Sequence, residues 1–426
     1  MYLNNMFNLI KNGLVLQPDF SFKKQNILTQ NETIYELLEP DEVPSKPVSS
    51  VMDLDGQVIF PGLINGHDHL IDTNWRPLGN MPVENWYEWE STIHSEPDYK
   101  LMQKLSASDL YVVGMYKNVI SGATTIVDHF PSEVSGTFIN HPIASILKNY
   151  YLAHSVSEKR LHWCSSIADQ YRRSQGVIPF ILHTGQGKSK EITDEIENLN
   201  RIGALERNTV LVGCEFLKES DLQLIASKQA SIVWIPESSE RLFNAQPNIK
   251  LIRDLGIKLC LGTDSTNTGS RNLQTAFSAA LKHSAEFLNN SLTAKDLINM
   301  VTAESANIFG ISKKVGTIAP GKNADFVIFE QQENEDPLET FIKLTPEDFS
   351  MVIHKGRIII GNEEFKRISA IDFSHYSEVK LNDVNKIMLG RPVQLIERIC
   401  NKLNKDIKFP FFDVTSEDDQ YVWDRV

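Results

Sequence analysis

The middle of the chain alternates short apolar runs with amphipathic stretches, a pattern typical of strands that alternate with helices. Predicted strands cover residues 60–65, 123–129, 150–156, 177–183, 209–216, 231–235 and 257–262, and predicted helices include 188–202, 220–227 and 273–288. An eighth strand between Phe130 and Lys148 gives no clear signal. Such alternation indicates an α/β fold with parallel strands, and we predict a TIM-like (β/α)8 barrel, regular or distorted. The alternative is a doubly wound sheet, but no glycine-rich fingerprint follows the first strand.

Short strand patterns without intervening helices return at both ends of the chain. Examples are residues 6–10 and 13–17 near the start, and 324–329, 351–354 and 357–360 near the end. Lone short strands cannot bury a face unless they pair with one another. We therefore predict a small β-sandwich domain from both termini (1–60 plus 310–368), a barrel domain (61–309), and a helical and extended C-terminal segment (369–426) that packs on the body.

Composition and net charge indicate which kinds of binding partner the protein is expected to have. The 426 residues carry a net charge of −13, which argues against a nucleic-acid or anionic-membrane partner. No apolar run approaches the roughly 20 residues of a membrane span. The four cysteines are far apart and show no C-x-x-C spacing. We expect reduced thiols, a cytoplasmic location and a small-molecule substrate, with a homodimer left open as the assembly.

Candidate metal ligands stand at three predicted strand ends. His67 and His69 flank Asp68, and strand alternation turns the two histidines to one side and Asp68 to the other. Another predicted strand ends at His183, and a third runs into Asp264. Three imidazoles and one carboxylate suit one divalent ion such as Zn²⁺ or Fe²⁺. Taken singly, each histidine is more often a satisfied polar terminus, and the aspartate a helix N-cap.

The same stretches carry a family resemblance over nearly the whole chain. The chain resembles the amidohydrolase superfamily, in particular its mononuclear cytosine-deaminase-like and chlorohydrolase-like branch. The segments that carry the resemblance are Pro61–Leu70, Gly122–His129, Leu182–Gly187, Ile232–Ser239, Leu261–Ser265, Thr302–Asn307 and Gly316–Asp325. The resemblance implies a single Zn²⁺ or Fe²⁺ held by His67, His69, His183 and Asp264. No lysine or glutamate suited to a second metal stands near Leu152–Ser155.

Two positions depart from the family pattern, and both concern proton transfer. Gln186 stands where family deaminases have the glutamate that shuttles protons, and an amide cannot take or give a proton at ordinary pH. Gly213 stands where relatives have the sixth-strand histidine. One interpretation is a hydrolase that acts on a C–N bond of a cyclic amidine or amide and uses a metal-bound hydroxide with Asp264 as the base. The alternatives are a catalytically inactive metal protein on this fold, or a lyase or isomerase.

Glu215 is a candidate replacement for the lost proton-transfer groups. Strand alternation places residues 211, 213 and 215 on one face, so Glu215 is expected beside the space left by Gly213. We therefore name Asp264, Glu215 and Gln186 as candidate catalytic residues. The alternative is that Glu215 caps or pairs near Glu219 at the start of the next helix.

Four more polar or aromatic residues are candidates for substrate contact. His129 and His154 end their strands, Trp234 lies in the seventh strand, and Asn74 follows the metal histidines in a long loop. A backbone hydrogen bond for the histidines, and a core position for Trp234, are the competing interpretations. Substrate choice cannot be inferred from fold-level analogy.

Overall fold

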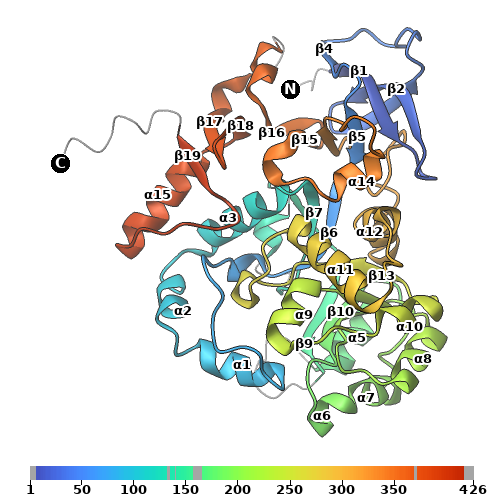
Figure 1. The fold of residues 1–426 in the computed structure, drawn as a ribbon, viewed down its shortest axis with the longest axis vertical. Helices are drawn as coiled ribbons and strands as arrows, with labels where there is room; N and C mark the ends of the chain where they lie inside the picture. The colour runs from blue at the N-terminus through green and yellow to red at the C-terminus, as the bar shows by residue number, and fades with distance from the viewer. Residues whose placement is uncertain (1–5, 132–134, 140, 157–165, 369–371, 417–426) are drawn as a thin grey trace.

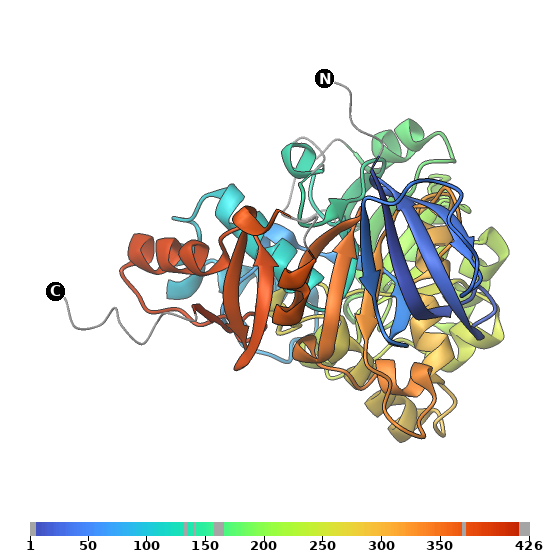
Figure 2. The same cartoon turned by 90° about the horizontal axis from the view of Figure 1, so that it is seen from above.

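The structure is a computed structural model that describes residues 6–131, 135–139, 141–156, 166–368 and 372–416. A helix-wrapped α/β body lies below a large sheet built from both ends of the chain (Figure 1). Seen from above, the N-terminal and C-terminal strands stand side by side across the top of the body (Figure 2). No helix in the described ranges is both long and apolar enough to span a membrane.

Eight parallel strands form the body, which confirms the predicted α/β class. They are β6 (Leu63–Asp68), β7 (Ala123–Asp128), β8 (Ser145–Ile146), β9 (Tyr151–Ser155), β10 (Phe180–Thr184), β11 (Thr209–Gly213), β12 (Ser231–Trp234) and β13 (Leu259–Leu261). The strand that gave no clear signal in the sequence is β8, which has only two residues. A strand that short has no periodicity to detect.

The eight strands follow one another in chain order but are divided into two sheets. One has the order β13-β12-β11-β10-β9 and the other β6-β7-β8. The two sheets meet where β6 approaches β13, because Asp68 and Asp264 form a parallel bridge. At this seam the backbone N–H groups of Thr263 and Asp264 both donate to the carbonyl of His67, at 2.9 and 3.0 Å. The strand ends that carry the candidate ligands are therefore fixed to one another by the backbone.

The small domain is one hydrogen-bonded sheet of eleven strands, where we predicted a β-sandwich. Its order is β19-β17-β18-β16-β15-β14-β5-β1-β2-β3, with β4 paired to β1. The strands are β1 (Phe7–Leu16), β2 (Phe22–Gln30), β3 (Thr33–Leu38), β4 (Ser50–Asp53), β5 (Val58–Pro61), β14 (Phe326–Phe329), β15 (Phe349–His354), β16 (Arg357–Asn362), β17 (Tyr376–Leu381), β18 (Val384–Leu389) and β19 (Val414–Ser416).

The C-terminal segment has two parts. Its strands β17, β18 and β19 extend the small domain's sheet, which the sequence did not predict. The helix that begins at Pro392 and the residues after it lie against the body, where Arg398 donates to the Asp109 carboxylate at 2.6 Å and Phe412 stacks on Tyr116 with ring centroids 5.2 Å apart. Pairing between β16 and β18 joins residues distant in sequence, and local patterns do not report such pairing.

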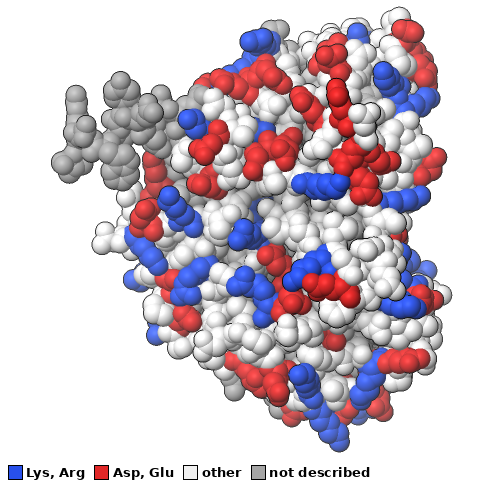
Figure 3. Space-filling model, in the orientation of Figure 1, with Lys and Arg blue, Asp and Glu red and all other residues white. Residues whose placement is uncertain are grey.

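Helices cover the outside of the body. They are α1 (Trp86–Ile93), α2 (Pro97–Met102), α3 (Ala107–Val119), α5 (Ile167–Ser174), α6 (Lys190–Thr193), α7 (Glu195–Arg201), α8 (Glu219–Lys228), α9 (Pro236–Phe243), α10 (Ile249–Asp254), α11 (Leu273–Phe287), α12 (Ala294–Met300), α13 (Ala303–Ile308), α14 (Pro337–Phe341) and α15 (Pro392–Leu403). The stretch 188–202, predicted as one helix, is divided into α6 and α7. Side chains of both charge signs are interspersed over the face shown in Figure 3.

An aromatic cluster around Phe60 joins the small domain to the body. Phe60 on β5 is fully buried and stacks on Phe341 of α14, with ring centroids 4.3 Å apart. Phe329 of β14 meets Phe60 edge-on at 5.3 Å, and Phe277 of α11 reaches Phe341 at 6.3 Å. Aromatic burial of this kind contributes strongly to stability because each ring removes a large apolar area from water.

We expect Phe60→Ala to lower the free energy of unfolding by about 3–5 kcal/mol, because it leaves a cavity at this junction. The matched control is Phe287→Ala, which removes an aromatic ring that is 69% exposed on α11. The control is expected to change stability by less than about 0.5 kcal/mol. Urea denaturation of the three proteins measures both effects. Equal losses in the two variants would contradict a central role for Phe60.

Candidate metal centre

Four ligand-type side chains converge at the C-terminal ends of three strands. The Nε2 atoms of His67, His69 and His183 lie 3.1 to 3.3 Å from one another. Oδ1 of Asp264 lies 3.5 Å from Nε2 of His67 and 3.3 Å from Nε2 of His69. All four side chains are buried, and their ligand atoms lie within 4.8 Å of one another. The structure therefore brings together the four residues named from the sequence.

The spacing of these atoms fits a single divalent metal ion. Two ligands about 2.0–2.1 Å from a tetrahedral ion stand roughly 3.3 Å apart, which is the separation found here. Hydrogen bonding alone explains the cluster poorly, because one neutral imidazole N–H cannot serve two nitrogen neighbours at once. His67, His69, His183 and Asp264 are accordingly the residues that would hold the ion.

Burial and neighbouring groups shift the pKa of Asp264 in opposite directions. Burial alone would raise the pKa of Asp264, but hydrogen bonds from His67 and His69 hold that pKa well below its usual range. Burial lowers the pKa of His67, and it holds that of His183 well below the ordinary value. Burial also acts to lower the pKa of His69, but the hydrogen bond and the charge of Asp264 outweigh it and raise that pKa. Neutral imidazoles and an ionised carboxylate are the forms that bind a metal ion.

A buried ion pair holds the strand that carries two of the ligands. Asp68 points away from the cluster, and its carboxylate lies 2.8 Å from Nζ of Lys117. Asn118 of the same helix, α3, donates to Asp68 at 2.9 Å, and Thr263 of the neighbouring loop donates at 3.0 Å. The sequence analysis missed Lys117, although a buried aspartate between two inward histidines requires a positive partner.

Two hydroxyl groups hold the second carboxylate oxygen of Asp264, and one of them belongs to the first turn of α9. The Ser238 hydroxyl donates to Oδ2 of Asp264 at 2.5 Å, and Thr268 donates to the same oxygen at 3.2 Å. Asp264 itself has a φ of 61°, a left-handed conformation that is uncommon outside glycine. The surrounding structure thus holds the carboxylate in an orientation that leaves Oδ1 toward the histidines.

Gln186 and Glu215 form a second polar pair close to the cluster. Nε2 of Gln186 donates to Oε1 of Glu215 over 3.4 Å, and the Ser239 hydroxyl donates to the same oxygen at 2.5 Å. Gly213 leaves room for this pair, because a Cβ there would lie 2.6 Å from Gln186 and 2.8 Å from Glu215. Burial raises the pKa of Glu215 to about 7, against the lowering effect of the hydrogen bond from Ser239.

Glu215 lies beside Gly213 as expected, but strand alternation is not what places it there. The strand β11 ends at Gly213, and φ is positive at both Gly213 (90°) and Cys214 (72°), so strand alternation does not extend to Glu215. A turn directs the carboxylate inward instead. The competing expectation, that Glu215 caps the helix near Glu219, does not describe the structure, because the Asp221 carboxylate accepts from the backbone N–H of Lys218 at the start of α8, at 2.9 Å.

The two candidate histidines lie at different depths. His154 lines a cavity above the cluster, with its ring centroid 5.6 Å from that of His183, and burial lowers its pKa to about 3. His129 lies beneath, with its ring centroid 4.9 Å from those of His67 and His183. Neither ring nitrogen of His129 has a hydrogen-bond partner in the described ranges. The expected backbone bond is therefore absent there for His129.

The positions of Trp234 and Asn74 do not fit their predicted contact with substrate. Trp234 is fully buried in the core, and its indole N–H donates to Gln246 at 2.7 Å. The Asn74 side chain accepts from the backbone N–H of Trp75 and donates to Asn267 in the segment after β13. Neither residue lines the cavity above the cluster. The core interpretation of Trp234 is the one that the structure supports.

A cavity of about 460 Å³ opens above the metal cluster. His69, His183, Gln186 and Asp264 form one end of its lining. Its walls combine aliphatic and aromatic side chains and include Trp86 and Trp89 of α1. This volume lies within the range of small-molecule sites.

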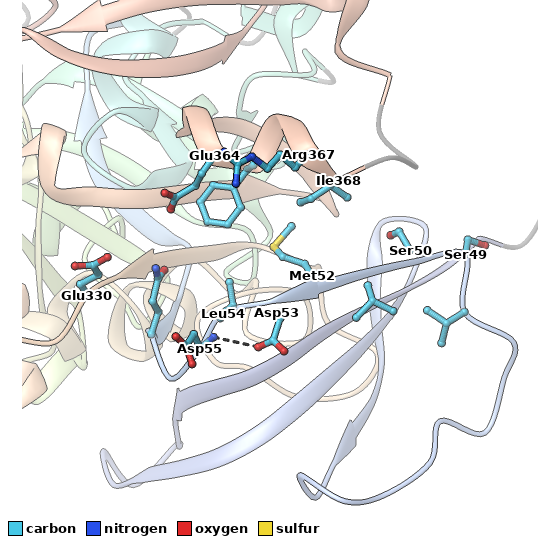
Figure 4. A pocket seen from close by; sticks show the side chains of 14 residues that line it. Ser49, Ser50, Met52, Asp53, Leu54, Asp55, Glu330, Glu364, Arg367 and Ile368 are labelled. Atoms are coloured by element: carbon cyan, nitrogen blue, oxygen red, sulfur yellow. Dashed lines mark hydrogen bonds between the residues drawn. The ribbon is translucent and has the colours of Figure 1, made fainter.

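A second cavity, of about 710 Å³, lies in the small domain, away from the metal cluster. Figure 4 shows its lining along β4, with Asp53 accepting from the backbone N–H of Asp55 and with Glu364 and Arg367 opposite. It contains none of the four ligand residues. Its size therefore does not make it the reactive site.

Comparisons with known sequences agree with the geometry. A family model, described as the amidohydrolase family, matches residues 180–359. The 5-methylthioadenosine/S-adenosylhomocysteine deaminase of Thermoanaerobacter pseudethanolicus is 24% identical, covering 92% of this chain and 99% of that protein. The 5'-deoxyadenosine deaminase of Methanobrevibacter smithii is also 24% identical, over 76% of this chain and 83% of its own length.

Solved structures share the fold. An adenosine deaminase from Xanthomonas campestris with bound zinc superposes with a TM-score of 0.72 at 15% identity, covering 93% of this chain and 98% of that one. A mutant atrazine chlorohydrolase from Arthrobacter aurescens, complexed with zinc and atraton, gives 0.69 at 15% identity, over 93% and 100% of the two chains. The family model spans the strands β10 to β13 together with His183, Gly213 and Asp264, and the relatives match most of the remaining chain, so the chain is similar to amidohydrolases over nearly its whole length.

Proposed function

We propose that the protein is a metal-dependent hydrolase that breaks a C–N bond of a small cyclic amidine or amide. The observation that carries the proposal is the set of three imidazoles and one carboxylate, spaced for one divalent ion, at the end of a cavity of small-molecule size. The names of the relatives support the reaction class, because deamination is the hydrolysis of a C–N bond.

The ligand residues and their neighbours have separate tasks in this proposal. A divalent ion bound there would polarise the substrate and lower the pKa of water toward neutrality. Asp264 stays ionised, because hydrogen bonds from His67 and His69 hold its pKa well below the usual range. A carboxylate with so low a pKa is a weak base, and it could take the proton of the attacking water because a bound divalent ion would make that water more acidic. Ser238 and Thr268 keep the other oxygen of Asp264 fixed, so the accepting atom faces the histidines.

Glu215 supplies the proton that the leaving nitrogen requires. With a pKa near 7 it exists in both forms at neutral pH, which suits a general acid. Its Oε1 is held by Ser239 and Gln186, while Oε2 has no partner within the described residues. Gln186 lines the cavity and positions this carboxyl without exchanging protons itself. A metal ion nearby would favour the ionised form and lower the pKa of Glu215.

One observation favours the second candidate function, a metal-binding protein without hydrolysis. Gln186 and Gly213 replace two groups that the family resemblance assigns to proton transfer. Ammonia release by the zinc-loaded protein, measured over a panel of cyclic amidines and amides, separates the two functions. Release from any member that exceeds the His69→Ala background supports hydrolysis, and a silent panel supports the second function.

We expect the purified protein to bind one divalent ion, and His69→Ala to lose most of it. The histidine supplies one of four ligand atoms, and three remaining ligands hold the ion less tightly. Inductively coupled plasma mass spectrometry measures the metal content. The control is His94→Ala, which removes a histidine that lines the same cavity outside the ligand set. Equal metal in the two variants would exclude the site as described.

We expect Gln186→Glu to raise ammonia release from amino-heterocycles by about tenfold, which corresponds to about 1.4 kcal/mol of transition-state stabilisation. The new carboxyl would stand beside Glu215, and two adjacent carboxyls share a proton because like charges disfavour double ionisation. The pair then offers a protonated acid near neutral pH. Metal content should not change. If no amino-heterocycle gives faster ammonia release, Gln186 is not the residue that limits deamination.

We expect Glu215→Gln to reduce kcat about a hundredfold or more while metal content stays the same, because general acids contribute at least that much. Ser239→Ala provides a pH test. It removes a hydrogen bond that favours the ionised form, so the pKa of Glu215 rises and the fall of kcat/KM at alkaline pH moves to higher pH. A pH profile that stays unchanged in Ser239→Ala would remove Glu215 from the reaction.

A further inference from the structure

Asn85 joins the start of the cavity helix α1 to the segment that follows His183. Asn85 immediately precedes α1 with an extended backbone, and its side chain makes no capping hydrogen bond to that helix. An asparagine at this N-cap position ordinarily accepts from a backbone N–H two or three residues later. Its Oδ1 accepts instead from the backbone N–H groups of Lys188 and Ser189, at 3.0 and 2.9 Å. The side chain therefore holds a second segment of the chain.

The backbone around Asn85 pairs with the same segment. Asn85 and Gly187 form an antiparallel bridge, and the N–H of Trp86 donates to the carbonyl of Gln186 at 3.1 Å. A Cβ at Gly187 would lie 2.5 Å from Oδ1 and 3.0 Å from Cα of Asn85, so this close approach depends on glycine. The segment therefore fits closely against the start of α1.

The segment held in this way carries Gln186, and apart from this bridge it has no strand or helix of its own. It lies between β10, which ends at Thr184, and α6, which begins at Lys190. The Gln186 amide donates to the Glu215 carboxyl over 3.4 Å. Because this distance is already longer than the usual hydrogen bond, a small displacement of the segment would break the contact.

The first turn of α1 also forms part of the cavity wall. Trp86 and Trp89 line the cavity, and Trp86 belongs to one apolar cluster with Ile192 of α6. In Figure 1, α1 and α6 both lie at the lower end of the body. Asn85 thus lies where the wall of the cavity meets the segment that carries Gln186.

We propose that Asn85 is a positioning residue, which keeps the Gln186 amide in contact with the Glu215 carboxyl and so holds that carboxyl in place for the reaction. The inference rests on the proposed function for the role of Glu215 as the proton donor. Asn85 does not line the cavity, so it acts through Gln186 without touching the substrate. Misplacing a reacting group by about 1 Å can lower a rate about a hundredfold, because the reacting atoms lose their alignment.

The competing role for Asn85 is to stabilise α1 alone. Its Nδ2 donates to Oε1 of Glu88 at 2.9 Å, within the first turn of that helix. Glu88→Ala removes this bond and leaves Oδ1 of Asn85 on the backbone of the other segment. The variant therefore measures the helix-stabilising role by itself.

Hydrogen exchange measures the hold on the segment without turnover. Mass spectrometry follows the peptide that contains Lys188 and Ser189 in the zinc-loaded protein. We expect this peptide to exchange about tenfold faster in Asn85→Ala, because two backbone N–H groups lose an acceptor. Ser189→Ala is the matched control, because it removes a buried hydroxyl without a hydrogen-bond partner in the described structure and leaves the backbone N–H in place. Unchanged exchange in Asn85→Ala overturns the proposal.

A double-mutant cycle measures the consequence for the reaction. We expect Asn85→Ala to lower kcat about tenfold, with KM and zinc content changed less than about twofold. In the Gln186→Ala background the same substitution should lower kcat less than about twofold, because no amide remains to be positioned. The double variant Asn85→Asp/Glu88→Gln exchanges donor and acceptor between the two side chains and keeps an oxygen for both N–H groups. It should therefore restore most of kcat.

The outcomes separate this proposal from the proposed function. An equal loss of kcat in the wild-type and Gln186→Ala backgrounds overturns the positioning role, and so does a loss of the same size in Glu88→Ala. If no cyclic amidine or amide releases ammonia, the proposed function fails, and a crystal structure of Asn85→Ala then decides the positioning role. A Gln186 amide still in contact with Glu215 in that structure overturns the role, and a displaced amide supports it.

Discussion

The buried ion pair between Asp68 and Lys117 is the interaction on which the rest of the site depends. Both side chains are almost completely removed from water, so each charge requires the other. Asp68 sits between the two metal histidines in sequence, and fixing its carboxylate on one side of β6 holds the His67 imidazole on the other, while His69 follows directly after the strand. The backbone of β6 then binds the loop after β13 through the carbonyl of His67, which brings Asp264 into range.

Local sequence patterns predicted the features that depend on neighbours along the chain. Apolar runs located the strands, and the residues that end them include all four metal ligands. Patterns failed where the outcome depends on distant pairing or on backbone conformation. Strand β18 pairs with β16 on one side and β17 on the other, and the sequence predicted only a helical and extended segment there. A tryptophan can line a pocket or fill the core. Only tertiary packing shows that Trp234 is buried, with its indole N–H donating to Gln246.

Gly213 shows how one change of residue type can alter a site in two ways. With φ at 90°, the position accepts glycine at little cost and most other residues only with strain. Its missing side chain leaves the volume that Gln186 and Glu215 occupy. The missing side chain of Gly213, the neutral amide of Gln186 and the inward carboxyl of Glu215 therefore form one connected arrangement, in which each depends on the others.

The adjacent hydroxyls of Ser238 and Ser239 allow α9 to hold two carboxylates at once. One hydroxyl holds Asp264 and the next holds Glu215, so a single peptide unit links both carboxylates. The two carboxylates belong to different segments, after β13 and after β11, and they share this one helix as a hydrogen-bond donor. A displacement of α9 would therefore disturb the proton acceptor and the proton donor at the same time, although neither acid lies on that helix.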